Sequence, residues 1–136
     1  MDRKSVGSET DGGYAFDRPV VGKLSNQTNV SVSLRFYAPS VECFSEWTAA
    51  DLKSFSSLVS KLRHLDIQEL RGNANLCKSH AKGSKIRNYR RPDGIGNDVK
   101  FHELKLSGRL RVHGVFQGPV FHLVWLDRNH QVFPNG

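Results

Sequence analysis

The chain has 136 residues and a mass of 15.3 kDa, which fits one domain with a buried core. With 38% hydrophobic and 24% charged residues, the composition excludes a wholly disordered chain and a collagen-like one. No apolar run approaches the roughly 18 residues that a membrane-spanning helix needs, so we expect no membrane association. The N-terminus has no apolar signal core, and the two cysteines lack metal-ligand spacing. We therefore expect a cytoplasmic protein with reduced thiols.

The positive charge is concentrated in the second half of the chain. The net charge is +7, but residues 1–70 carry eight basic and nine acidic groups, and residues 71–136 carry twelve basic and four acidic groups. Such an asymmetry favours a polyanionic partner, most commonly a nucleic acid. The alternative is that the basic balance only maintains solubility.

The first 29 residues differ from the rest. They are rich in Gly, Ser, Asn and Asp without a sustained apolar period, which predicts a flexible N-terminal arm before a single domain over residues 30–136. The arm could instead cover a groove or contact a partner. Residues 30–37 alternate between apolar and polar side chains, which predicts a half-buried strand that Pro39 ends.

Two helix signals follow. Thr48 and Asp51 form a capping-box pattern, and the apolar residues after them repeat at steps of three and four, at Leu52, Phe55, Val59, Leu62 and Leu65. A second such pattern, from Asp66 to Glu69, begins a short helix that Gly72 ends. Together they predict a helical hairpin that lies on a sheet.

Residues 78–91 form a basic segment that contains no acid. Tyr89 stands among its cations and could stack on a base. We expect nucleic acid to be bound by the basic and aromatic residues of this segment together with one later arginine: Lys78, Lys82, Lys85, Arg87, Tyr89, Arg90, Arg91 and Arg128. Residues 92–97 form a loop by composition.

From residue 99 the pattern is that of an antiparallel meander. Strands are predicted over residues 99–106, 109–116 and 120–126, with a short fourth strand at 131–133 and an irregularity near His102. The chain order predicts an α+β fold: an N-terminal strand, a helical hairpin, then a three- to four-stranded antiparallel meander with the helices on one face. The other face of the sheet would be partly open.

The candidate site lies on that open face. Period-two alternation places Arg109, Arg111 and His113 together on one strand, where a phosphate would relieve the repulsion between like charges. Lys105 and Glu103 on the neighbouring strand could reach the same surface. The alternative is a solvated face whose arginines pair with nearby acids.

This set of residues could cleave an RNA backbone through attack of the 2′-hydroxyl on phosphorus. His113, His130 or Glu103 would serve as base or acid, and Arg109 and Arg111 would stabilise the developing charge. No metal or other cofactor is implied, since His, Asp and Cys do not occur at ligand spacing. His122, on an apolar strand, is more typical of a hydrogen-bonded core histidine.

The element order resembles that of the RelE/ParE toxin superfamily. Leu104–Val112 is similar to the place where a Lys- or Arg-bearing strand of RelE-type toxins turns into one beginning with Arg, and Phe121–Leu126 is similar to their apolar central strand. The resemblance covers residues 30–136 and rests on pattern and order. The long arm, the long loop at residues 78–97 and Phe133 near the place of a terminal Tyr depart from the family pattern.

The resemblance implies a small cytoplasmic toxin that is inactivated by a cognate antitoxin and cuts mRNA on the ribosome without a metal. It implies catalytic cations at Lys105, Arg109 and Arg111, and an acid–base group near Arg128 and His130. His113 has no fixed counterpart in the family and enters from its position alone.

Three alternatives remain open from the sequence. The same basic face could bind RNA or the ribosome without catalysis. A ParE-like toxin would act on DNA gyrase instead of RNA. In a plain interaction domain the arm would be the functional part.

Overall fold

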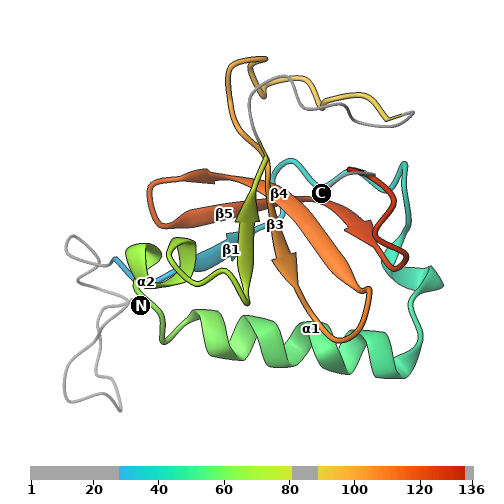
Figure 1. Cartoon of the computed structure of the whole chain (residues 1–136). Helices are drawn as coiled ribbons and strands as arrows, with labels where there is room; N and C mark the ends of the chain where they lie inside the picture. Colours follow the sequence, from blue (N-terminus) through green and yellow to red (C-terminus); the bar gives the residue numbers. More distant parts are fainter. Residues whose placement is uncertain (1–27, 81–88, 134–136) are drawn as a thin grey trace, which may run out of the picture.

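The computed structural model describes residues 28–80 and 89–133. They form an α+β fold with a five-stranded mixed sheet and two α-helices (Figure 1). The predicted arm lies outside the described residues apart from Thr28 and Asn29, as do Lys82, Lys85 and Arg87. In the described part of the chain, no helix is long and apolar enough to cross a membrane.

The strands are β1 (Ser31–Ser33), β2 (Cys77–Ser79), β3 (His102–Lys105), β4 (Arg111–Gln117) and β5 (Val120–Asp127). Their order across the sheet is β1-β5-β4-β3-β2. Strand β1 runs parallel to β5, and all other neighbours are antiparallel. The α+β class is therefore confirmed.

Three details of the strand prediction are corrected. The first strand has three residues because the chain turns after it, with the amide of Tyr37 donating to the carbonyl of Leu34. A strand, β2, lies at the start of the segment predicted only as basic and irregular. Residues 131–133 form no strand and lie in a bend that follows β5.

Both predicted helices are present: α1 (Ala49–Leu62), preceded by a 3-10 turn η1 (Phe44–Glu46), and α2 (Ile67–Arg71). The two capping boxes are formed. Oγ1 of Thr48 accepts from the amide of Asp51, whose carboxylate accepts from the amide of Thr48, both at 3.1 Å. These bonds satisfy N–H groups that have no partner inside a helix, and they fix where each helix begins.

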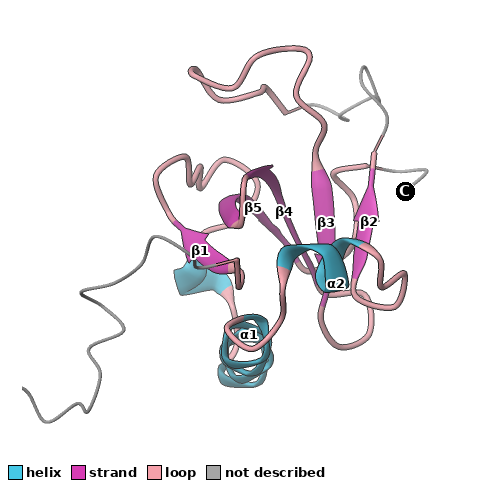
Figure 2. Cartoon of the chain, turned by 90° about the vertical axis from the view of Figure 1, so that its left-hand side faces the viewer, coloured by secondary structure: helices cyan, strands magenta, loops and turns pink. Residues whose placement is uncertain are grey.

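Both helices pack on the same face of the sheet, and α1 lies below the sheet in Figure 2. Leu58 and Leu62 of α1 and Leu70 of α2 share one core cluster with alternate strand residues such as Leu104 and Val112. Residues 103 and 113 consequently point to the opposite face, since successive side chains of a strand alternate.

The opposite face is covered, in contrast to the predicted open face. A second core forms there around Trp125, with Phe101 stacked on it at a centroid distance of 4.9 Å and Phe133 packed nearby. A register shift between His113 and Gly114 accompanies this core. The irregularity is thus in the β4–β5 pairing, at the register partner of His102, and not in the strand that carries His102, where it was predicted.

Candidate acid–base site

Four ionisable side chains cross the helix-free face of the sheet in a row. His80 directly follows β2, Glu103 lies on β3, His113 on β4 and Asp127 at the end of β5. Glu103 pairs with His113 in the strand register, so neighbouring strands bring these groups together. Each of the four side chains is at most 6% exposed. Buried charges at this density require partners.

His113 and Asp127 form the most deeply buried pair, with Nε2 2.8 Å from Oδ2 and neither side chain exposed. Burial raises the pKa of Asp127, but hydrogen bonds from His113 and from the amides of Gln131 and Val132 outweigh it and lower that pKa. Burial lowers the pKa of His113 despite the attraction of Asp127. A neutral His113 therefore donates from Nε2 to a carboxylate, and its Nδ1 carries the lone pair.

Glu103 is the centre of the cluster. Its Oε1 lies 3.0 Å from Nε2 of His80 and 3.2 Å from Nε2 of His130, and its Oε2 accepts from Nε of Arg111 at 3.3 Å. Burial alone would raise the pKa of Glu103, but the His80 hydrogen bond and the neighbouring histidines lower it to about 2. Glu103 is therefore ionised at neutral pH and too weak a base to accept a proton there. Its role is to orient the groups around it.

His130 brings an imidazole from this cluster to the surface. Its side chain is 24% exposed, against 1% for Glu103. It stands in the turn after β5 with φ 54, a left-handed conformation that non-glycine residues seldom adopt. The carboxylate of Asp127 holds this turn by accepting from the amides of Gln131 and Val132. These hydrogen bonds to Asp127 therefore hold His130 in its strained backbone conformation.

The predicted strand cations do not share one solvated face. Arg109 is exposed and precedes β4, and its Nη2 donates to the carbonyl of Asn129 at 3.2 Å, which places it beside the turn of His130. Arg111 also donates to the carbonyl of Gly108 at 2.8 Å. His113 is buried under the covering segments. His113 is not solvated as predicted because the second core covers this face, and sequence alternation alone does not reveal such a core.

Lys105 and Arg128 each form hydrogen bonds away from the Glu103 cluster. Nζ of Lys105 donates to the carbonyl of Ala74 at 3.2 Å. Arg128 donates to the carbonyl of Glu46 and lies 3.5 Å from a carboxylate oxygen of Glu42. Neither cation is within hydrogen-bond distance of the Glu103 cluster in any contact that the structure records.

The described residues of the basic segment are divided between surface and core. Lys78 is exposed on β2, opposite Glu103 in the register, and Arg90 is exposed and pairs weakly with Asp93. Arg91 instead lies over the ring of Phe101, at 4.8 Å, and Tyr89 packs against the second core. Only the first two therefore offer a surface to a nucleic acid.

Two members of the cluster were not predicted. His80 lies within the basic segment of residues 78–91, and Asp127 comes directly after the strand predicted over residues 120–126. The available signals were the spacing of two between Lys78 and His80, which predicts one strand face, and the position of Asp127 directly after an apolar strand. Neither signal identifies the partner across the sheet.

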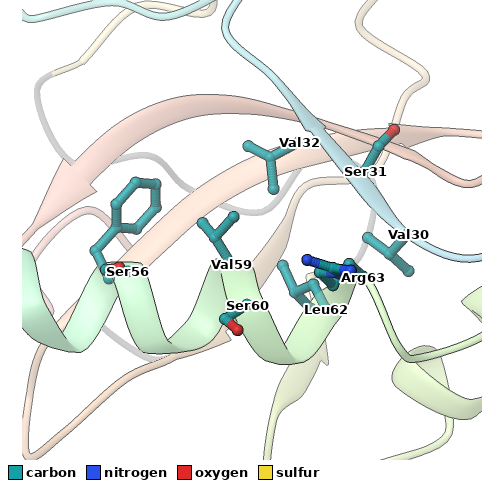
Figure 3. Close-up of a pocket in the computed structure, with 9 residues that line it drawn as sticks. Val30, Ser31, Val32, Ser56, Val59, Ser60, Leu62 and Arg63 are labelled. Carbon is teal, nitrogen blue, oxygen red and sulfur yellow. The ribbon is translucent and has the colours of Figure 1, made fainter. Parts of the chain in front are cut away.

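A separate groove lies between β1 and α1, with a volume of about 620 Å³. Figure 3 shows Val32 and Val59 facing each other across it, with Arg63 at one end. Its lining contains valine, leucine, phenylalanine and serine side chains and one arginine, but no carboxylate and no histidine. The groove therefore offers no carboxylate or imidazole for acid–base chemistry.

Comparisons with protein-family models, with curated proteins and with solved structures find no match to this chain.

Proposed function

We propose that this chain is an endoribonuclease that cleaves RNA with its own side chains as acid and base. One observation carries the proposal: the partly exposed imidazole of His130 is held 3.2 Å from the Glu103 carboxylate, which also binds Arg111. A carboxylate that orients a histidine beside fixed cations suits proton transfer at a phosphodiester.

In the proposed reaction, neutral His130 accepts the proton of a ribose 2′-hydroxyl. The 2′-oxygen then bonds to the adjacent phosphorus and the bond to the 5′-oxygen breaks. That oxygen takes a proton from a water molecule, and the hydroxide formed removes the proton from the His130 imidazolium. The products are a 2′,3′-cyclic phosphate and a 5′-hydroxyl. Arg109, beside the turn of His130, binds the phosphate, and Glu103 stabilises the protonated imidazole.

His113 has a different place in this scheme from the one predicted. With no exposed surface, it offers nothing for a substrate to contact. It acts as a positioning residue, because its partner Asp127 also holds the turn that carries His130.

The substrate that we propose is mRNA on the ribosome, cut by a cytoplasmic toxin that an antitoxin inactivates, in a RelE-like fold. The basic second half of the chain and the resemblance of residues 30–136 to RelE-type toxins support this part of the proposal.

The test is cleavage of end-labelled RNA, free and on ribosomes, by the full chain. We expect cyclic-phosphate ends from the wild type and a loss of about 10²–10⁴-fold in rate for His130→Ala. His64→Ala, a change of an exposed histidine outside the cluster, is the matched control and should cleave at the wild-type rate. Intact RNA with a folded wild-type protein would overturn the proposal.

A second candidate function is RNA binding without cleavage. The observation that favours it is the engagement of Arg111, whose guanidinium already binds Glu103 and the carbonyls of Gly108 and Leu110. This candidate predicts salt-dependent RNA binding that Arg109→Ala weakens and His130→Ala leaves unchanged.

A further inference from the structure

The inner part of the cluster has the composition of a metal site. One ligand atom from each of His80, Glu103 and His113 lies within 4.8 Å of the other two, and all three residues are buried. Two imidazoles and a carboxylate are a protein ligand set of zinc sites in which a water molecule takes the fourth position. Tetrahedral zinc places its ligand atoms roughly 3.3 Å apart, so small side-chain rotations would close the set.

The protonation states of Glu103 and His113 also suit metal binding. Glu103 is ionised, with a pKa lowered to about 2. His113 is neutral, and its buried Nδ1 has no hydrogen-bond partner in the part of the chain that the structure describes. A buried lone pair without a donor is costly, and a bound cation would satisfy it.

Asp127 would hydrogen-bond one of the metal-binding histidines without binding the metal itself. Metal-binding histidines usually donate their other ring N–H to a carboxylate, which fixes the tautomer and the ring orientation. Nε2 of His113 does so to Asp127 at 2.8 Å. The RNA-cleavage scheme gives His80 no role as acid or base, and its hydrogen bond to Glu103 stabilises the ionised carboxylate.

We propose that His80, Glu103 and His113 form a binding site for a divalent transition-metal ion, with Zn²⁺ as the cation of best fit. Exposures of at most 6% shield the site from a substrate, so its metal is structural. The metal site does not depend on the proposed function, although the two share Glu103, which the substrate does not reach because its side chain is 1% exposed.

The test is calorimetric titration of the chelator-treated full chain with Zn²⁺ alone. We expect one Zn²⁺ per chain, at least a 100-fold weaker affinity for His80→Ala, and a 10–100-fold weaker affinity for Asp127→Asn. His122→Ala is the matched control, because His122 is equally buried in the sheet but bonds to Gln117. It should bind as the wild type does.

Circular dichroism of each variant identifies a loss of fold. Where a variant unfolds, the ligands are identified instead on the wild-type protein, by X-ray absorption at the zinc edge. The spectrum should report two imidazole nitrogens and one carboxylate. Failure of the wild type to bind Zn²⁺, equal binding by His80→Ala, or a spectrum without histidine would overturn the proposal. None of these measurements involves RNA, so a failed cleavage assay leaves them unaffected.

Discussion

Nε2 of His113 lies 2.8 Å from Oδ2 of Asp127, and this contact joins the middle of β4 to the last residue of β5 where no water reaches. The same carboxylate accepts the amides of Gln131 and Val132. One side chain thus connects the sheet, the buried histidine and the turn of His130. Its removal should be felt in all three.

Asp127→Ala should destabilise the protein by about 3–5 kcal/mol, because removing one partner leaves buried polar groups without hydrogen bonds. Urea denaturation followed by tryptophan fluorescence measures the change. Asp93→Ala is the control: this carboxylate is 98% exposed and lies 3.7 Å from Arg90, so its midpoint should stay at the wild-type value. Equal midpoints for both variants would contradict the account of the buried pair.

Gly114→Ala should lower the thermal midpoint strongly. A Cβ at this position would collide with the carbonyl oxygen of His122 and lie 2.7 Å from Cζ of Phe121, so β4 and β5 would have to separate. Gly118→Ala offers a comparison, since a Cβ there meets nothing within 4 Å and costs only the strain of φ 57, about 1–2 kcal/mol. Calorimetry should therefore give a much lower thermal midpoint for Gly114→Ala than for Gly118→Ala.

His102 should make the fold sensitive to mild acid. Burial first, then the charge of Arg71, lowers its pKa from 6.5 to about 4, so the unfolded chain binds the proton more tightly. The stabilisation that neutral His102 contributes is therefore complete above pH 6.5. It is lost as the pH falls towards 4, which lowers the free energy of unfolding by about 3 kcal/mol. His102→Gln should make the fall in unfolding free energy between pH 6.5 and 4.5 shallower, and the remaining slope comes from His113 and His122, whose pKa values burial also lowers. A wild-type slope in that variant would assign the acid sensitivity to another group.

The two cysteines should differ in reactivity. Burial raises the pKa of Cys77 to about 11, whereas hydrogen bonds from Ser45 lower the pKa of the half-buried Cys43. Because the thiolate is the nucleophile, iodoacetamide at neutral pH should modify Cys43 alone in the folded protein and both thiols in urea. Mass spectrometry of peptides distinguishes the two. Equal labelling in the folded state would contradict the burial of Cys77.

Features set by neighbours in the sequence were predictable. The capping box of Thr48 and Asp51 and the apolar repeat after it locate α1, because a helix is built from contacts three and four residues apart. The α+β class follows from the order of helical and alternating segments. Glu103, Arg111, His113 and His130, which were named from the sequence, do come together.

Features set by distant contacts were not predictable. His80 reaches Glu103 only because β2 pairs with β3 across 23 residues of chain, and nothing near His80 indicates that pairing. Alternation correctly placed His113 on the helix-free face. The burial of that face depends on Phe101, Phe133 and their neighbours folding back over it, and no local pattern reports such coverage.

The anchoring of the last described turn by Asp127 has a consequence for the motions of the site. The amide protons of Gln131 and Val132 lie in the turn after β5, outside any strand, where hydrogen exchange is normally fast. Here they are bonded to a carboxylate that cannot leave without opening the β4–β5 pair. Their deuterium uptake should therefore proceed through global unfolding, at the rate of the innermost strands, and His130 should keep its orientation for as long as the sheet exists.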